Sequence, residues 1–117
     1  ATVTVCHSHT ADLAAKTREA DVVVTGAGVP GLVDGSMLSE GAVVIDASAN
    51  RVAASDGTGH EVVGDVDFES AKEKASAITP VPGGVGPVTL ALLLYNTVAA
   101  ASEQTGTPVV LPGIDGR

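Results

Sequence analysis

Short runs of β-branched and other apolar residues recur along the chain, and polar or glycine-rich stretches separate them. The longest lie at residues 2–6, 21–25 and 42–46, and shorter ones lie at 62–65 and 77–78. Continuous apolar runs of this length are typical of strands that are buried on both faces of a parallel sheet. We therefore predict a strand at each position, with 42–46 apolar enough for the centre of the sheet.

Helix-forming stretches fall between these runs. Residues 11–20 carry a thin apolar stripe that Ser8 or Thr10 can cap, and Asp67 can cap a helix over 68–74. The most regular helical pattern covers residues 89–104. Because strands alternate with helices or turns, the predicted fold is α/β, with a mostly parallel sheet and crossovers on both of its faces.

Residues 26–31 have the spacing GxGxxG directly after the second predicted strand, and Asp46 lies 20 residues after Gly26. This spacing is that of a dinucleotide-binding turn with its ribose-binding acid. A full crossover helix should follow such a turn, but residues 32–40 leave room for only a few turns of helix. Pro30 also biases Val29 away from helix. A short turn beside a cofactor crevice is the favoured interpretation.

Two further stretches predict irregular structure. Residues 51–61 are polar and contain Asp56-Gly57, which favours a surface excursion or a short hairpin. Residues 79–89 hold three prolines and three glycines, so this loop is stiff at some positions and has bare backbone at others. It leads into the helix at 89–104, whose N-terminus favours polar or anionic ligands. The alternative is a purely structural hairpin before a C-terminal helix.

In an open parallel sheet, ligands bind beyond the carboxyl ends of the strands. The candidates there are His7, Ser8, Gly26, Gly28, residues 46–50 and the proline–glycine loop. The first strand end, residues 6–9, contains no acid, which favours the 2′-phosphate of NADP over the free 2′-hydroxyl of NAD. Ser8 is either a phosphate ligand or a helix cap, and Asp46 is a base, a ribose contact or an acceptor of backbone hydrogen bonds.

Composition narrows the possible functions. The formal net charge is −8, so nucleic acid and anionic membranes are poor partners. The single cysteine, Cys6, excludes an internal disulfide and a cysteine-cluster metal site, and no zinc-ligand spacing occurs. No leader sequence or long apolar run suggests a membrane, so we expect a cytoplasmic protein. The acidity reflects either an ordinary solvated surface or adaptation to a salt-rich cytoplasm.

Three blocks of sequence carry a family resemblance. Residues 82–89, Pro-Gly-Gly-Val-Gly-Pro-Val-Thr, resemble the PGGVGP(M/F)T signature of the methylenetetrahydrofolate dehydrogenase/cyclohydrolase family, with Val88 in place of Met or Phe. Residues 2–8 resemble its ATVTxCHS strand, and residues 64–66 together with 75–80 resemble a third block. The blocks occur in the family's order between residues 1 and about 101.

The resemblance implies that residues 1–105 are the later part of an NADP-binding, Rossmann-like domain, incomplete at its N-terminus. Residues 106–117 contain two prolines and three glycines, which predicts a flexible tail. The full enzyme of this family oxidises 5,10-methylenetetrahydrofolate to the methenyl form and hydrolyses that to 10-formyltetrahydrofolate. The family's GRSxxVGxP loop and YxxxK motif do not occur in this chain. We therefore expect no catalytic residue here and no activity from this chain alone, and the residue spacing noted above predicts no metal ligand. A homodimer is also implied.

The resemblance and the predicted strand ends together assign the candidate site residues. The predicted NADP-binding residues are His7, Ser8, Gly26, Gly28, Ala47, Ala49 and Thr89. The predicted residues bordering the tetrahydrofolate substrate are Pro82, Gly83 and Gly84. The competing hypothesis is a stand-alone nucleotide-binding or interaction module without catalytic activity. A YxxxK-bearing segment upstream in the same gene product would distinguish the two.

Overall fold

A computed structural model describes residues 1–110 and 112–113 of the chain. These residues divide into two compact units, Ala1–Val85 and Gly86–Arg117. The first unit contains every strand of the described residues, and the second contains nearly all of the helix α3, Val85–Thr105. Part of the predicted tail, residues 111 and 114–117, lies outside the described residues. The described part of that tail has no regular secondary structure.

The centre of the first unit is a three-stranded sheet with the order β1-β2-β5. Its strands are β1 (Val22–Thr25), β2 (Val43–Asp46) and β5 (Ala77–Ile78), and all of them are parallel. β2 is central, as its apolar sequence predicts, and Val44 has no exposed surface. The predicted α/β class and parallel sheet are therefore confirmed.

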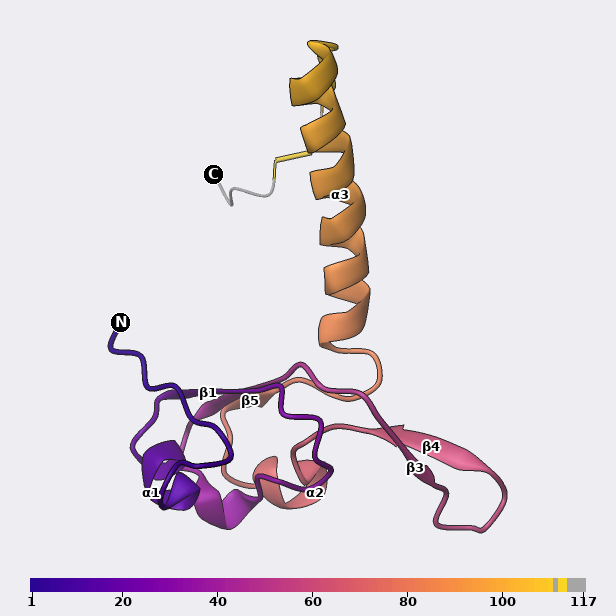
Figure 1. Ribbon diagram of the computed structural model, residues 1–117. Coiled ribbons are helices and arrows are strands. Elements are labelled where there is room, and N and C mark those ends of the chain that lie inside the picture. Colours follow the sequence, from indigo (N-terminus) through magenta and orange to yellow (C-terminus); the bar gives the residue numbers. More distant parts are fainter. Residues whose placement is uncertain (111, 114–117) are drawn as a thin grey trace. The chain divides into compact units, whose positions relative to one another are not determined.

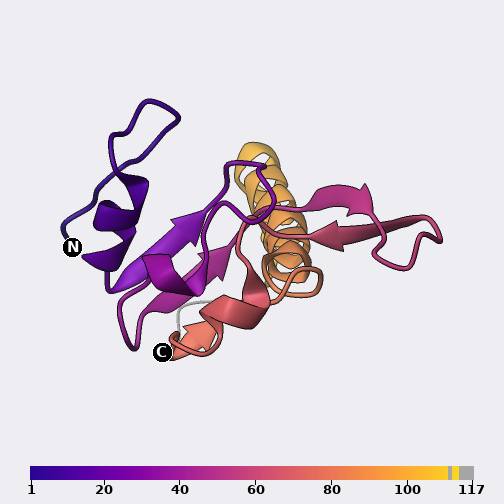
Figure 2. The same cartoon turned by 90° about the horizontal axis from the view of Figure 1, so that it is seen from below.

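Short helices cover one face of this sheet. They are α1 (Leu13–Arg18), the 3₁₀ turn η1 (Gly35–Met37) and α2 (Phe68–Ala71), and Figures 1 and 2 show α1 and α2 on the same side of the strands. The core between the layers consists of small aliphatic side chains, namely Val23, Val33, Leu38, Val44, Val66 and Ala71. Val22 and Val24 alternate with the buried residues of β1 and are exposed on the opposite face. Within the described residues of this unit, the prediction of crossovers on both faces is therefore wrong.

The polar stretch after β2 forms a β-hairpin, as its Asp-Gly turn predicts. β3 (Asn50–Ala53) pairs in antiparallel register with β4 (His60–Val63). The hairpin extends away from the parallel sheet and ends in an exposed loop (Figure 1). The sequence predicts a separate brief strand at 62–65. Its first two residues, Val62 and Val63, belong instead to β4 of this hairpin.

One predicted strand is wrong. Residues 2–6 form no β ladder within the described residues, and Val3 and Val5 are 78% and 82% exposed. Residues 1–4 and Cys6 line a groove of about 870 Å³ together with β1, and no described hydrogen bond joins this segment to β1. An apolar run becomes a strand only where a neighbour satisfies its backbone groups, and sequence periodicity does not report that neighbour.

The predicted cap of the first helix is also wrong. Asp12, not Ser8 or Thr10, caps α1, because its carboxylate accepts the amide of Ala15 at 3.0 Å. Ser8 lies instead in a turn in which Thr10 N–H donates to the carbonyl of His7 at 2.8 Å. The predicted cap of α2 is confirmed, since the Asp67 side chain accepts the amide of Ser70.

Candidate functional site at the carboxyl edge of the sheet

Three loops leave the parallel sheet side by side at its carboxyl edge. Thr25 at the end of β1 is in register with Asp46 at the end of β2, and Ala47 N–H donates to the Thr25 carbonyl at 2.9 Å. On the other side of β2, Asp46 N–H donates to the Thr79 hydroxyl at 2.8 Å. This pairing brings together the 26–31 turn, the β2 exit (residues 47–50) and the start of the proline–glycine loop.

Asp65 is the buried centre of this edge. Its side chain has no exposed surface and accepts hydrogen bonds from five donors. Three are consecutive backbone amides of the 26–31 turn, those of Ala27, Gly28 and Val29, at 2.6, 3.1 and 2.8 Å. The other two are side chains of the β2 exit and the start of β3, Ser48 Oγ at 2.6 Å and Asn50 Nδ2 at 2.9 Å.

This environment stabilises the ionised form of the Asp65 carboxyl. Burial opposes ionisation, but the hydrogen bonds from Ser48, Asn50 and the turn amides outweigh it and lower the pKa below its ordinary value. A carboxylate that accepts several N–H and O–H donors avoids the cost of an unpaired buried charge. Asp65 is therefore an internal anion at the edge of the sheet.

Asp46 is the second buried carboxylate, and its partners are backbone groups. Its side chain is 3% exposed and accepts the amides of Ser48 at 3.0 Å and Val66 at 2.9 Å. Gly64 lies against it so closely that a methyl group there would overlap the carboxylate. Of the three roles that the sequence leaves open for Asp46, the geometry favours the acceptor of backbone hydrogen bonds.

The 26–31 turn lacks the features that a dinucleotide fingerprint requires. The amides that would receive a diphosphate already bind Asp65, and the next element is the three-residue 3₁₀ turn η1 rather than a crossover helix. Gly28 and Gly31 have φ of +72° and +67°, which is left-handed backbone that glycine adopts without strain. The favoured interpretation, a short turn beside a crevice, agrees with this geometry.

The structure brings four of the predicted cofactor residues together. Gly26 and Gly28 lie on the exposed side of the 26–31 turn, and Ala47 and Ala49 are exposed on the β2 exit beside it. Gly28 N–H also approaches Ser48 Oγ at 3.4 Å, so the two segments are in contact.

The remaining predicted cofactor residues lie elsewhere in the chain. His7 and Ser8 are exposed in the turn before α1, where His7 N–H donates to the Thr10 hydroxyl at 2.9 Å. They do not follow a strand, because residues 2–6 form none in the described part of the chain. Thr89 is on α3 in the second unit. Its role stays a prediction.

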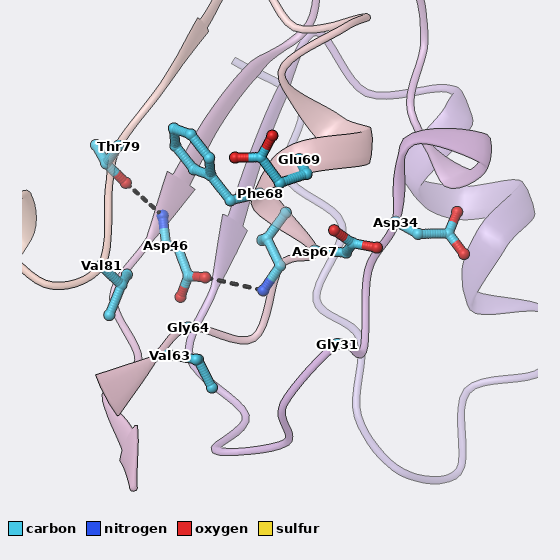
Figure 3. Close-up of a pocket in the computed structure, with 11 residues that line it drawn as sticks. Gly31, Asp34, Asp46, Val63, Gly64, Asp67, Phe68, Glu69, Thr79 and Val81 are labelled. Atoms are coloured by element: carbon cyan, nitrogen blue, oxygen red, sulfur yellow. Dashed lines mark hydrogen bonds between the residues drawn. The ribbon is translucent and has the colours of Figure 1, made fainter. Parts of the chain in front are cut away.

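A pocket of about 400 Å³ opens beside the proline–glycine loop (Figure 3). Its lining includes Thr79 and Val81, the buried Asp46 with Gly64, and the aromatic ring of Phe68. The predicted substrate residues Pro82, Gly83 and Gly84 follow Val81 directly in the chain. A side chain at Gly84 would overlap the carbonyl of Pro80, so this turn of the loop requires glycine.

Sequence reasoning missed the role of Asp65. The residue belongs to the block Gly64-Asp65-Val66, which contributes to the family resemblance, but no spacing rule links it to amides about 37 positions earlier. Among the described residues, no group of three or more His, Cys, Asp or Glu side chains could hold a metal ion.

The fold and this edge define the class of the protein, which is a Rossmann-like α/β domain. Residues 1–105 match the sequence family of the tetrahydrofolate dehydrogenase/cyclohydrolase, NAD(P)-binding domain. The chain belongs to this family. It is 68% identical over 112 residues to bifunctional protein FolD 2 of Haloarcula marismortui and 69% identical to bifunctional protein FolD of Halobacterium salinarum. The aligned region is 96% of this chain but only 38% of each relative.

Solved structures agree with this assignment. The methylenetetrahydrofolate dehydrogenase-cyclohydrolase of Trypanosoma brucei, complexed with NADP cofactor and inhibitor, superposes with a TM-score of 0.82 at 49% identity. The superposition covers 90% of this chain and 36% of that one. The bifunctional enzyme from Campylobacter jejuni gives a TM-score of 0.80, also at 49% identity, over 89% of this chain and 35% of the other.

Proposed function

We propose that this chain is the NADP-binding part of a bifunctional enzyme that oxidises 5,10-methylenetetrahydrofolate to methenyltetrahydrofolate and hydrolyses that product to 10-formyltetrahydrofolate. The observation that carries the proposal is the match of the NAD(P)-binding domain over residues 1–105, at 49% identity to a structure that contains NADP. The competing hypothesis of a stand-alone binding module has no comparable support.

The proposed cofactor residues offer an accessible backbone surface. A methyl group built on Gly26 would meet nothing within 4 Å, so a ligand can approach the backbone there closely. Ala47 and Ala49 are small and exposed beside it, and His7, Ser8 and Thr89 complete the proposed set. The polar, uncharged character of Ser8 and the absence of an acid from residues 6–9 favour NADP over NAD.

The bound NADP would supply the acceptor for the hydride of the folate substrate. The role of Pro82, Gly83 and Gly84 is to shape one wall of the folate site. These three residues carry no titratable side chain, so the acid–base groups for hydrolysis must come from another part of the enzyme.

The proposal extends to the setting of the enzyme. We propose a cytoplasmic homodimer that binds tetrahydrofolate derivatives and binds neither nucleic acid nor membranes, in line with the net charge of −8. The haloarchaeal relatives support adaptation to a salt-rich cytoplasm. By length and composition alone α3 could cross a membrane, and none of its apolar window is buried within the described residues. A single helix of this kind is weak evidence for a membrane span.

The test is an assay of the full-length polypeptide that contains this chain, with 5,10-methylenetetrahydrofolate and either NADP or NAD in low and in molar salt. We expect NADPH to form, the methenyl product to disappear by hydrolysis, and NAD to be the poorer acceptor. NADP binding with no turnover in either salt condition would instead support the stand-alone module.

A further inference from the structure

Three consecutive amides of the 26–31 turn converge on one carboxylate. Successive N–H groups that point into one concavity form a nest, which in many proteins binds a phosphate or another anion. Here the nest of Ala27, Gly28 and Val29 contains the fully buried carboxylate of Asp65, with N···O distances of 2.6 to 3.1 Å. The anion in this turn is thus part of the protein.

The same carboxylate links the turn to the neighbouring strand. One oxygen, Oδ2, accepts from Ala27, Gly28 and Ser48, and the other, Oδ1, accepts from Val29 and Asn50. Ser48 stands between Ala47 and Ala49 on the β2 exit. Asp65 therefore joins the two backbone segments that carry most of the proposed cofactor residues.

We propose that Asp65 is a positioning residue that occupies the anion position of the 26–31 turn, denies this position to a phosphate of the cofactor, and holds the turn against the β2 exit. The proposal rests on the proposed NADP-binding function and adds a determinant of how the cofactor site is shaped. It places the cofactor on the outer surface of the turn, at Gly26 and Gly28, rather than in its amide nest.

The local geometry limits this role to aspartate. An asparagine at position 65 would present an NH₂ group to at least two of the five donors, because each carboxylate oxygen accepts two or three of them. The backbone cannot move away to relieve that contact, since Gly64 is packed against Asp46 and Val66 N–H is bound to Asp46 Oδ2.

The first experiment compares Asp65→Asn in the full-length protein with the matched control Asp56→Asn. Asp56 also accepts a backbone amide, that of Thr58, but it lies in the exposed tip of the hairpin. We expect Asp65→Asn to raise the Kd for NADP by about 10-fold or more, as for the loss of a hydrogen bond to a charged group. The KM for the folate substrate should stay within about twofold, and the control should match the wild type in both values.

The second experiment uses Asp65→Ala, which empties the nest. Formate or inorganic phosphate should bind there, raise the Tm in a saturable way and, for formate, lower the Kd for NADP toward the wild-type value. Neither anion should do this to the wild type, whose nest is already filled, and chloride at equal ionic strength serves as the salt control. Amide resonances of residues 27–29 report the occupied nest directly in NMR spectra.

If Asp65→Ala does not fold, Ser48→Ala replaces it. This variant keeps the carboxylate, the three amides and the hydrogen bond from Asn50, but it removes the hydroxyl that joins Asp65 to the segment between Ala47 and Ala49. A severalfold rise in the Kd for NADP is expected. A folded Asp65→Asn or Ser48→Ala protein that binds NADP like the wild type would overturn the proposal. Failure of the wild type itself to bind NADP would overturn the proposed function instead.

Discussion

At the scale of single residues, two buried carboxylates organise the edge of the sheet from which the proposed site is built. Asp46 accepts backbone amides from the β2 exit and from Val66, and Asp65 accepts the amides of the 26–31 turn. Ser48 contacts both of them, through its amide to Asp46 and through its hydroxyl to Asp65. The 26–31 turn, the β2 exit and residues 65–66 are therefore held by one hydrogen-bonded network.

The lowered pKa of Asp65 predicts how stability depends on pH. A carboxyl whose pKa is lower in the folded state stabilises that state above its unfolded pKa of about 3.9, and this stabilisation is lost as the pH falls through the folded pKa. The difference in unfolding free energy between wild type and Asp65→Asn should therefore be largest above about pH 4 and should shrink on acidification.

Urea unfolding of both proteins across this pH range provides the measurement. Asp34 and Asp56 also have lowered pKa values, from hydrogen bonds of Ser36 and Thr58, but they are present in both proteins and cancel in the comparison. A difference that grows as the pH falls would show that Asp65 is not preferentially ionised in the folded protein.

At the scale of elements, the termini of the helices depend on side chains that the periodicity does not indicate. Asp12 caps α1 with φ of +52°, a left-handed conformation that aspartate and asparagine tolerate better than most residues. The sequence predicts the start of the last helix at residue 89, but α3 begins at Val85. Gly86 and Pro87 lie in its first turn, where backbone N–H groups have no partner within the helix, so proline costs no hydrogen bond there.

The cap assignment leads to a test by substitution. Asp12→Ala should lower the unfolding free energy by about 1 kcal/mol, because the amide of Ala15 loses its partner and alanine is strained at positive φ. Asp12→Asn should lower the unfolding free energy by only a few tenths of that amount, since asparagine is an equally good cap. Ser8→Ala is the matched control and should stay within about 0.5 kcal/mol of wild type. Equal losses for Asp12→Ala and Ser8→Ala in thermal or urea unfolding would contradict the assignment.

At the scale of the whole molecule, the chain spans little more than a third of the relatives that it matches. The sole tyrosine, Tyr95, lies among the leucines of α3 and begins no YxxxK motif. The loop beside the pocket offers backbone groups without a titratable side chain at residues 82–84. The prediction that this chain contains no catalytic residue rests on these two features.

We accordingly predict that the 117-residue chain by itself does not form NADPH from 5,10-methylenetetrahydrofolate and NADP. Holding the two reactants in a reactive geometry supplies roughly 7–11 kcal/mol of barrier lowering, and one wall of the folate site cannot provide that orientation. The assay should be run in low and in molar salt, with the full-length protein as the positive control. NADPH formation by the isolated chain in either condition would show that catalytic groups lie within it.

The sequence by itself determined the class of the fold and the family. The valine-rich runs at 21–25 and 42–46 indicate strands by their β-branched residues. The hairpin and the cap of α2 follow from local residues such as Asp56-Gly57 and Asp67. Local propensity is sufficient for these features because the forces that form them act within a few residues.

Only the tertiary structure decided which backbone N–H and C=O groups are hydrogen-bonded to which partners. Residues 2–6 have the composition of a buried strand, but a strand also needs a neighbour, and none pairs with them in the described residues. In the same way, residues 26–31 have the spacing of a phosphate-binding turn, but their amides bind Asp65, which lies more than 35 residues later. Hydrogen bonds between distant segments depend on the packing of the whole sheet, and this packing determines which partner each backbone group finds.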